Sequence, residues 1–210
     1  MKKCEKDLDR NEDCNITLKE IYNAMSKEEF TALLEAIILG DAEIEFHCSY
    51  KSLLHGVVDC FVRLRPCKED LESEFVNNIW VLKVNKNRQQ NNKMTVNIST
   101  DNNYFNLNIV EFANEHKQIN RKNYYLIDKI LQVLENDRIQ EGACEQYINA
   151  LKTKYVSLAN VIRKMKKAEN KNSKSTSIQS VAINDLIMSA NLPLTEEEII
   201  IRWSKILCES

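Results

Sequence analysis

Two segments in the first third of the chain repeat hydrophobic residues at intervals of three and four, the spacing of amphipathic helices. In the first segment, residues 26–40, Ser26 and Glu29 have the spacing of a capping box. Gly40 follows the last apolar residue, at the position where a left-handed glycine often ends a helix. The second segment covers residues 50–65 and stops before a proline. We therefore expect two helices, each burying one face.

Elsewhere apolar and polar residues alternate, which is the period-two pattern of a strand with one buried face. Residues 42–48 alternate in this way between the two predicted helices. Three further alternating runs follow the second helix, and Asn-rich connectors separate them. Because these runs are consecutive, the pattern predicts an antiparallel meander with one face in water. The three runs are 79–85, 93–99 and 104–112.

Helical spacing returns in the remaining sequence. Residues 123–135 form one amphipathic segment, and residues 144–165 repeat apolar side chains at alternating steps of four and three over three heptads. A polar stretch follows and is typical of a linker. Two shorter apolar segments, 178–190 and 194–210, complete the chain, and each predicts a helix.

These elements predict an α+β fold in which an antiparallel sheet of about four strands is covered on one face by helices. A helical C-terminal extension follows the α+β domain, which itself ends in a long amphipathic helix. The expected divisions are a polar tail at 1–15, the α+β domain at 16–168, a linker at 169–177 and a helical segment at 178–210.

The amino-acid composition of the chain argues against several functional classes. The chain has three Gly in 210 residues, and no phosphate-binding loop, dinucleotide fingerprint or nucleophile elbow occurs, so we expect no cofactor. The seven Cys are unevenly spaced, which favours free thiols in a reducing compartment. The N-terminus lacks an apolar leader, and no run is long enough to cross a membrane. We therefore expect an intracellular protein, cytoplasmic or nuclear, that does not act at a membrane.

Six side chains between residues 47 and 67 could ligate a metal or supply a nucleophile. His47 and Cys48 point to opposite faces of a strand, and closely paired ligands are missing, so the spacing argues against zinc. No orienting third group accompanies a Cys–His pair such as Cys48 with His55. For an enzyme, the first residues to test are Glu43, Glu45 and His47. The six side chains are His47, Cys48, His55, Asp59, Cys60 and Cys67.

The stretch GDAEIEF at residues 40–46, followed by a helix and an apolar strand, resembles the opening of Schlafen-like (AlbA-type) domains. RNA-cleaving members of that family use acidic residues near a Glu-Phe-Lys strand, and Asp41, Glu45 and Phe46 match these positions. The chain departs from the pattern: the acids are one residue too close, His47 replaces Lys, and the Gly-Gly before the next strand is missing. The resemblance therefore implies a degenerate, non-cutting subunit of an RNA-processing or nuclease complex.

The two C-terminal amphipathic segments favour binding to another protein or to a second copy of the chain. An isolated amphipathic helix is marginal in water, so each apolar face needs a counterpart. That counterpart is either the interior of the same chain or a partner, and both alternatives stay open. Thr195 and Glu198 predict a capping box, and an exposed Trp is a frequent anchor in helix-in-groove binding. The predicted partner-binding residues are Ile148, Leu151, Tyr155, Leu158, Ile162, Ile199, Trp203 and Leu207.

The alternative function is contact with nucleic acid. Residues 152–174 hold eight Lys or Arg against one Glu, which could neutralise phosphates in a salt-dependent way. Aromatic residues that stack on bases are nearly absent from this segment, and a solvated helix face is the favoured explanation of it. The residues predicted for this contact are Arg163, Lys164, Lys166 and Lys167. We expect a non-catalytic interaction subunit or adaptor, with this nucleic-acid contact as the alternative.

Overall fold

The computed structural model describes residues 16–40, 42–66, 72–77, 79–84, 92–101, 104–113, 123–169 and 177–209. The predicted tail at 1–15 lies outside the described residues, as do positions 170–176 of the predicted linker. The chain divides into two compact units, residues 1–63 with 68–119 and residues 64–67 with 120–210. Each unit has its own core and is described by itself.

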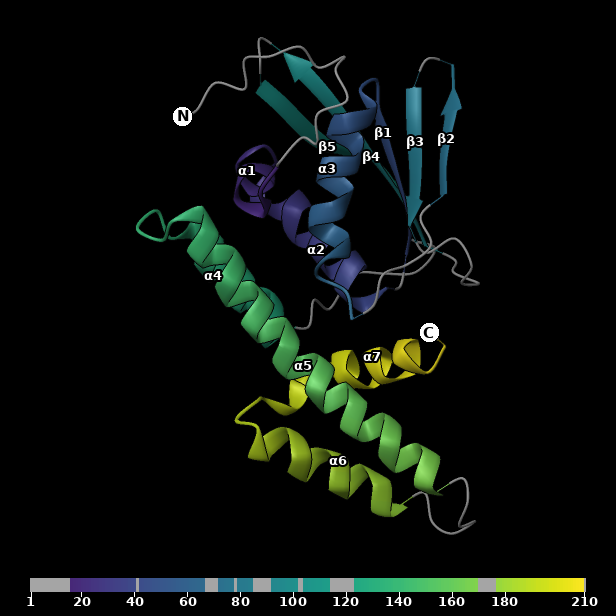
Figure 1. Ribbon diagram of the computed structural model, residues 1–210, viewed down its shortest axis with the longest axis vertical. Coiled ribbons are helices and arrows are strands. Elements are labelled where there is room, and N and C mark those ends of the chain that lie inside the picture. The colour runs from purple at the N-terminus through teal and green to yellow at the C-terminus, as the bar shows by residue number, and fades with distance from the viewer. Residues whose placement is uncertain are drawn as a thin grey trace. The chain divides into compact units, whose positions relative to one another are not determined.

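The N-terminal unit is a sheet with helices on one side (Figure 1). The helices are α1 (Leu18–Asn23), α2 (Lys27–Leu39) and α3 (Lys51–Val62). The strands are β1 (Glu43–Cys48), β2 (Glu72–Val76), β3 (Ile79–Val84), β4 (Lys93–Asp101) and β5 (Tyr104–Ala113). Their order across the sheet is β2-β3-β1-β4-β5. The α+β class is confirmed.

The expected antiparallel sheet of about four strands is wrong in two respects: the sheet has five strands and is mixed. Strand β1 pairs antiparallel with β3 and parallel with β4, so it separates the runs that were expected to form a meander. Strands β2 with β3 and β4 with β5 form two antiparallel hairpins on either side of β1. Alternation of polar and apolar residues is the same in parallel and antiparallel neighbours, so the sequence pattern does not encode this order.

Strand β1 anchors the core of this unit. Ile44, Phe46 and Cys48 are buried on the helical side, and the ring of Phe46 stacks on that of Phe61 from α3 with centroids 6.0 Å apart. Phe30 from α2 approaches Phe61 at 6.1 Å. These apolar contacts hold α2 and α3 against the central strand.

Local caps fix where the first helices begin and end. The Ser26 hydroxyl accepts a hydrogen bond from the Glu29 N–H at 3.2 Å, and Gly40 ends α2 in the left-handed conformation with φ 61°. Both predicted signals are therefore confirmed. A further capping box, Thr17 with Glu20, begins α1, a short helix that was not predicted from the sequence. Helix α3 ends at Val62, three residues before the expected boundary.

The C-terminal unit is helical, with α5 packed against α4, α6 and α7. Trp203 and Tyr155 are fully buried in this unit, and their rings meet edge to face with centroids 6.0 Å apart. The apolar periodicity that predicted four helices here is confirmed, with boundaries shifted by a few residues. The elements are α4 (Tyr125–Glu135), α5 (Glu141–Glu169), α6 (Ser177–Ser189), the 3-10 turn η1 (Leu194–Glu196) and α7 (Glu197–Glu209).

One buried carboxylate joins three parts of this unit. Glu196 has no exposed surface and accepts hydrogen bonds from the N–H groups of Tyr125 and Leu126, at 2.6 and 3.1 Å. These donors belong to the first turn of α4, where N–H groups lack partners within the helix. The hydroxyl of Tyr155 on α5 donates to the same carboxylate at 2.6 Å. Burial and the adjacent Glu196 raise the pKa of Tyr155 far above its ordinary value, so this phenol stays a donor.

The predicted capping box of Thr195 with Glu198 is wrong. The chain enters α7 through η1, so Thr195 lies inside the turn rather than at the cap position. The Glu198 carboxylate accepts from the Tyr124 hydroxyl at 2.7 Å and pairs with Arg202 one helical turn later. The acidic residues at the start of α7 therefore contact the beginning of α4. Rules for helix starts consider only residues close in the sequence and do not predict such contacts.

Replacing Glu196 by Ala should destabilise the C-terminal unit by about 3–5 kcal/mol, because three buried donors would lose their acceptor. Chemical denaturation followed by tryptophan fluorescence measures this change, in a Trp80→Phe background so that Trp203 alone reports the C-terminal unit. Glu197→Ala is the matched control and should cost less than about 1 kcal/mol, since an acidic residue at a helix start contributes only a small dipole interaction. Equal destabilisation by the two variants would contradict the role assigned to Glu196.

Candidate functional site

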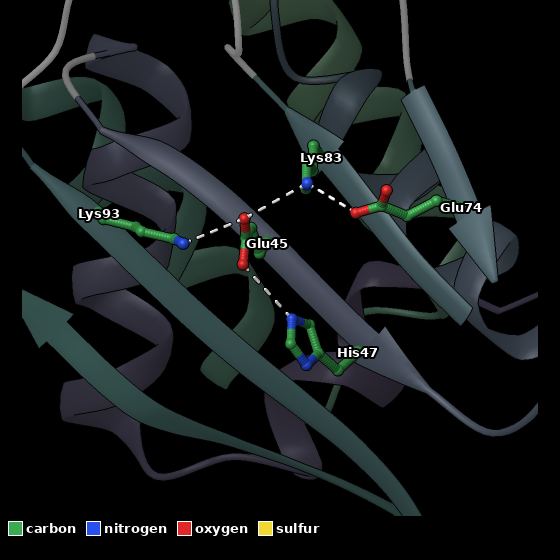
Figure 2. Close-up of polar contacts among 5 residues, drawn as sticks. All are labelled: Glu45, His47, Glu74, Lys83 and Lys93. Carbon is green, nitrogen blue, oxygen red and sulfur yellow. Dashed lines mark ion pairs between the residues drawn. The ribbon is translucent and has the colours of Figure 1, made fainter. Parts of the chain in front are cut away.

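The side of the sheet opposite the helices carries the charged residues of β1. Glu43, Glu45 and His47 alternate with the buried residues of the same strand and therefore share this open face. Figure 2 shows Glu45 at the centre, with Lys93 from β4 on one side and Lys83 from β3 on the other. This group, completed by Glu74 from β2, is called the Glu45 cluster below.

Short ion pairs connect the Glu45 cluster across four strands. The ammonium of Lys93 lies 3.1 Å from Glu45 Oε1, and that of Lys83 lies 3.8 Å from the same oxygen. Lys83 also lies 2.6 Å from Glu74 Oε1. The side chain of Glu45 is 13% exposed, so its pairs are screened by solvent less than ordinary surface ion pairs. Both ammonium groups are therefore already neutralised within the sheet.

The charge state of Glu45 follows from these neighbours. Burial is the largest single influence and would raise the pKa of this carboxyl. The hydrogen bond and charge of Lys93, the charge of Lys83 and the contact with His47 together outweigh burial, so the pKa of Glu45 lies below its ordinary value of 4.5. Glu45 is therefore ionised at neutral pH and is not suited to act as a general acid.

His47 lies beside Glu45, with Nε2 3.5 Å from Glu45 Oε2. This separation makes an ion-pair contact when His47 is protonated and is too long for a strong hydrogen bond. The residues that face His47 across the sheet are Val81 on β3 and Asn97 on β4, and neither is a nucleophile. The residues directly across from His47 therefore give it no nucleophile to activate, whereas Thr95 of β4 lies across from Glu45.

The described cysteines near this strand, Cys48 and Cys60, are buried in the interior of the N-terminal unit. Cys48 lies on the opposite face from His47, and burial raises the pKa of its thiol, so the thiolate needed for nucleophilic attack is disfavoured. The Cys60 thiol donates to the carbonyl of Ile16 at 2.9 Å. Within the described ranges, no group of three His, Cys, Asp or Glu side chains is arranged to hold a metal ion. Asp41 and Cys67 lie outside those ranges.

The residues predicted to bind a partner through the C-terminal helices lie largely inside the C-terminal unit. Six of the eight are buried, and Leu151 and Leu207 are partly exposed. A partner could reach the buried six only if these helices separated. That binding stays a prediction, and the structure provides the internal counterpart that was the other open alternative. The buried six are Ile148, Tyr155, Leu158, Ile162, Ile199 and Trp203.

The basic residues predicted for nucleic acid are divided between interior and surface. The Arg163 guanidinium donates to the carbonyl of Leu207 at 2.6 Å and so ties α5 to the end of α7. Lys164 and Lys167 are exposed, and Lys166 is partly exposed. Two exposed lysines make a modest electrostatic surface. Contact with nucleic acid stays a prediction.

Sequence reasoning missed an exposed apolar group on the hairpin of β2 and β3. Phe75, Val76 and Ile79 are 54%, 47% and 38% exposed. Phe75 contacts Trp80 with ring centroids 4.8 Å apart, and the ammonium of Lys51 lies 4.3 Å from the centre of the Trp80 ring. The available signal was the sequence ESEFVNNIW, in which two adjacent Asn join two β-forming runs. By the strand register, Phe75 and Trp80 lie on the face of the sheet that bears the helices, and Val76 and Ile79 lie on the other face of the same hairpin. We call these four residues at the end of the hairpin the outer patch.

Comparison with known proteins gives this chain no family. No family model matches the sequence, and no curated protein matches it either. Among the helices that the structure describes, none is both long and apolar enough to cross a membrane. The geometry of the chain itself must therefore carry any functional proposal.

Replacing Glu45 by Gln should destabilise the N-terminal unit by about 1–3 kcal/mol at pH 7, because Lys93 and Lys83 lose a partly buried charged acceptor. Since the pKa of Glu45 is lowered by folding, its stabilising effect is present above pH 4.5 and is lost as the pH falls below that value. The difference between the two proteins in free energy of unfolding should therefore shrink on acidification. Urea denaturation at a series of pH values measures it.

The control for this measurement is Glu74→Gln. Glu74 is 50% exposed and, among the described residues, its ion pair is with Lys83, so its loss should cost less than about 1 kcal/mol. A difference between Glu45→Gln and the unaltered protein that stays constant from pH 7 to pH 3 would refute the ionic role of Glu45.

Proposed function

We infer that this chain is a non-catalytic subunit that binds another protein, and that the outer patch on the hairpin of β2 and β3 makes the contact. The observation that carries this proposal is that three large apolar residues are exposed at the end of one edge hairpin, with Phe75 on one face and Val76 and Ile79 on the other. Grouped apolar surface is favourable to bury against a partner, whereas single exposed apolar residues are common on any protein.

The charged face of the sheet supports a binding role better than a catalytic one. Its two lysines are paired with carboxylates, and the residues across from His47 cannot act as nucleophiles. A preorganised site for catalysis would need unpaired charge or donors directed at one point. The Glu45 cluster instead connects the strands by ion pairs, including β2 to β3 of the neighbouring hairpin.

The location of this proposed contact differs from the one expected from the sequence. The C-terminal apolar stripes have internal counterparts, with Trp203 and Ile199 fully buried. The outer patch has exposed apolar area without opening any helix. An aromatic pair such as Phe75 with Trp80 is also typical of the residues that dominate binding energy at protein interfaces.

A photo-crosslinking phenylalanine analogue placed at Phe75 should form a covalent adduct with one discrete partner protein in cells of the source organism. The adduct should be lost when Val76 and Ile79 are both changed to Ser, because the exposed apolar surface on the other face of the hairpin end is removed. Gel electrophoresis and mass spectrometry identify the adduct.

The same analogue at Met188 is the matched control. Met188 is an apolar residue of α6 with 60% exposure, so it reports contacts made by any exposed apolar site. Discrete adducts at Met188 with none at Phe75 would contradict the proposal. Circular dichroism should be unchanged in the Ser variant, since exposed substitutions seldom alter stability by more than about 0.5 kcal/mol.

A further inference from the structure

The two edges of the sheet are treated differently by the chain. On β5, the N–H of Leu107 donates to the carbonyl of Ala24, and the N–H of Ile109 donates to the Glu29 carboxylate, both at 3.1 Å. The ladder between β4 and β5 also shifts register at Thr95. Bound backbone donors and an irregular ladder are the means by which proteins prevent an edge from pairing with another strand. The β5 edge is therefore closed.

The opposite edge, β2, has no such cover among the described residues. It ends the strand order, and no described strand pairs with its outer side (Figure 1). Val76 and Ile79 face each other across a two-residue connection, and Asn77 there has φ 51°. Such a connection closes on a hydrogen-bonded pair, so the N–H and C=O groups of Ser73 and Phe75 point outward. These groups are what an added strand requires.

The side chains of β2 define what an added strand would carry. Glu74 lies on the open face, is 50% exposed and pairs with Lys83 through one oxygen at 2.6 Å. Phe75 lies on the other face beside Trp80. A strand next to β2 would place one side chain near Glu74 and the next near Phe75. A basic residue fits the first position, and an apolar residue fits the second.

We propose that β2 accepts an extended segment of a partner protein as a sixth strand, with a basic residue beside Glu74 and an apolar residue beside Phe75. This proposal rests on the proposed function and specifies its mode of contact. A second copy of the chain fits less well, because β2 carries Glu72 and Glu74 and no basic residue, so self-pairing brings acidic strands together. Main-chain hydrogen bonds would supply affinity, and the two side-chain positions would supply specificity.

The test uses the full chain and a nine-residue peptide that alternates Lys with Val and Phe. Nuclear magnetic resonance of the ¹⁵N-labelled protein should show peptide-dependent shifts of the amides of residues 73 and 75. A peptide of the same sequence with an N-methyl group on every residue should not bind, because neither of its edges keeps an N–H donor. No shifts at millimolar peptide, or equal shifts with the methylated peptide, would overturn strand addition.

Two variants separate the backbone contribution from the charge. Ser73→Pro removes one outward N–H while leaving the inner ladder intact, and it should weaken peptide binding by at least about fivefold. Glu74→Lys should weaken binding of the Lys peptide by about threefold and favour a Glu-for-Lys peptide instead. Unchanged preference in Glu74→Lys would overturn the assignment of a basic partner residue.

Two further outcomes are distinguishable. If the peptide fails while the crosslink at Phe75 persists, the proposed function stands and strand addition is wrong. If light scattering shows a dimer that Ser73→Pro converts to monomer, the occupant of the edge is a second copy, and the proposal of a basic partner strand is overturned.

Discussion

The pairing of β1 on both sides is the constraint on which the N-terminal unit depends. Because β3 and β4 occupy its two edges, β1 must lie in the middle of the sheet, with Ile44, Phe46 and Cys48 facing the helices. The two hairpins then lie outside β1, and β2 and β5 become the edges of the sheet. Whether an edge can pair with another strand depends on the segments beside it. Among the described residues, the segments around α1 and α2 cover the β5 edge, and none covers the β2 edge.

On the open face of the sheet, the ion pairs of the Glu45 cluster connect neighbouring strands. On the helical face, apolar packing has this role. Alternating charges from Glu74 through Lys83 and Glu45 to Lys93 cross four strands, so each strand is bound to its neighbour by an ion pair as well as by the ladder. Lys83 and Glu45 each take part in more than one ion pair. Each pair therefore loses less side-chain entropy than an isolated ion pair would. The consequence for function is a face with its charges balanced internally and a hairpin held in a fixed register.

Interactions between residues close in the sequence made much of this fold predictable. Contacts between residues distant in the sequence determined the rest. Ser26 and Gly40 act within one helix, so their roles were evident from sequence, as were the alternating faces of β1. Strand order was not, since alternation carries no information about neighbours. Glu196 was also hidden: it belongs to a run of three Glu that reads as a solvated helix start, and its partners lie some 40 to 70 residues away. The apolar faces of the C-terminal helices looked unpartnered for a similar reason: the helices that cover them are distant in the sequence. In the structure these faces pack against one another.

An exposed aromatic on an uncovered edge strand carries a cost, which argues that the edge is retained for use. Edge strands with apolar side chains promote unwanted association, and proteins suppress it with bulges, charges or covering segments. This chain binds backbone donors of β5 with Ala24 and Glu29, whereas on β2 it leaves Phe75 more than half exposed and its edge uncovered by the described residues; Val110 on β5 is exposed to a similar extent. Glu74 beside it discourages pairing with like-charged strands while leaving a basic strand acceptable. One residue can therefore both protect the edge in isolation and select the strand that is allowed to join it.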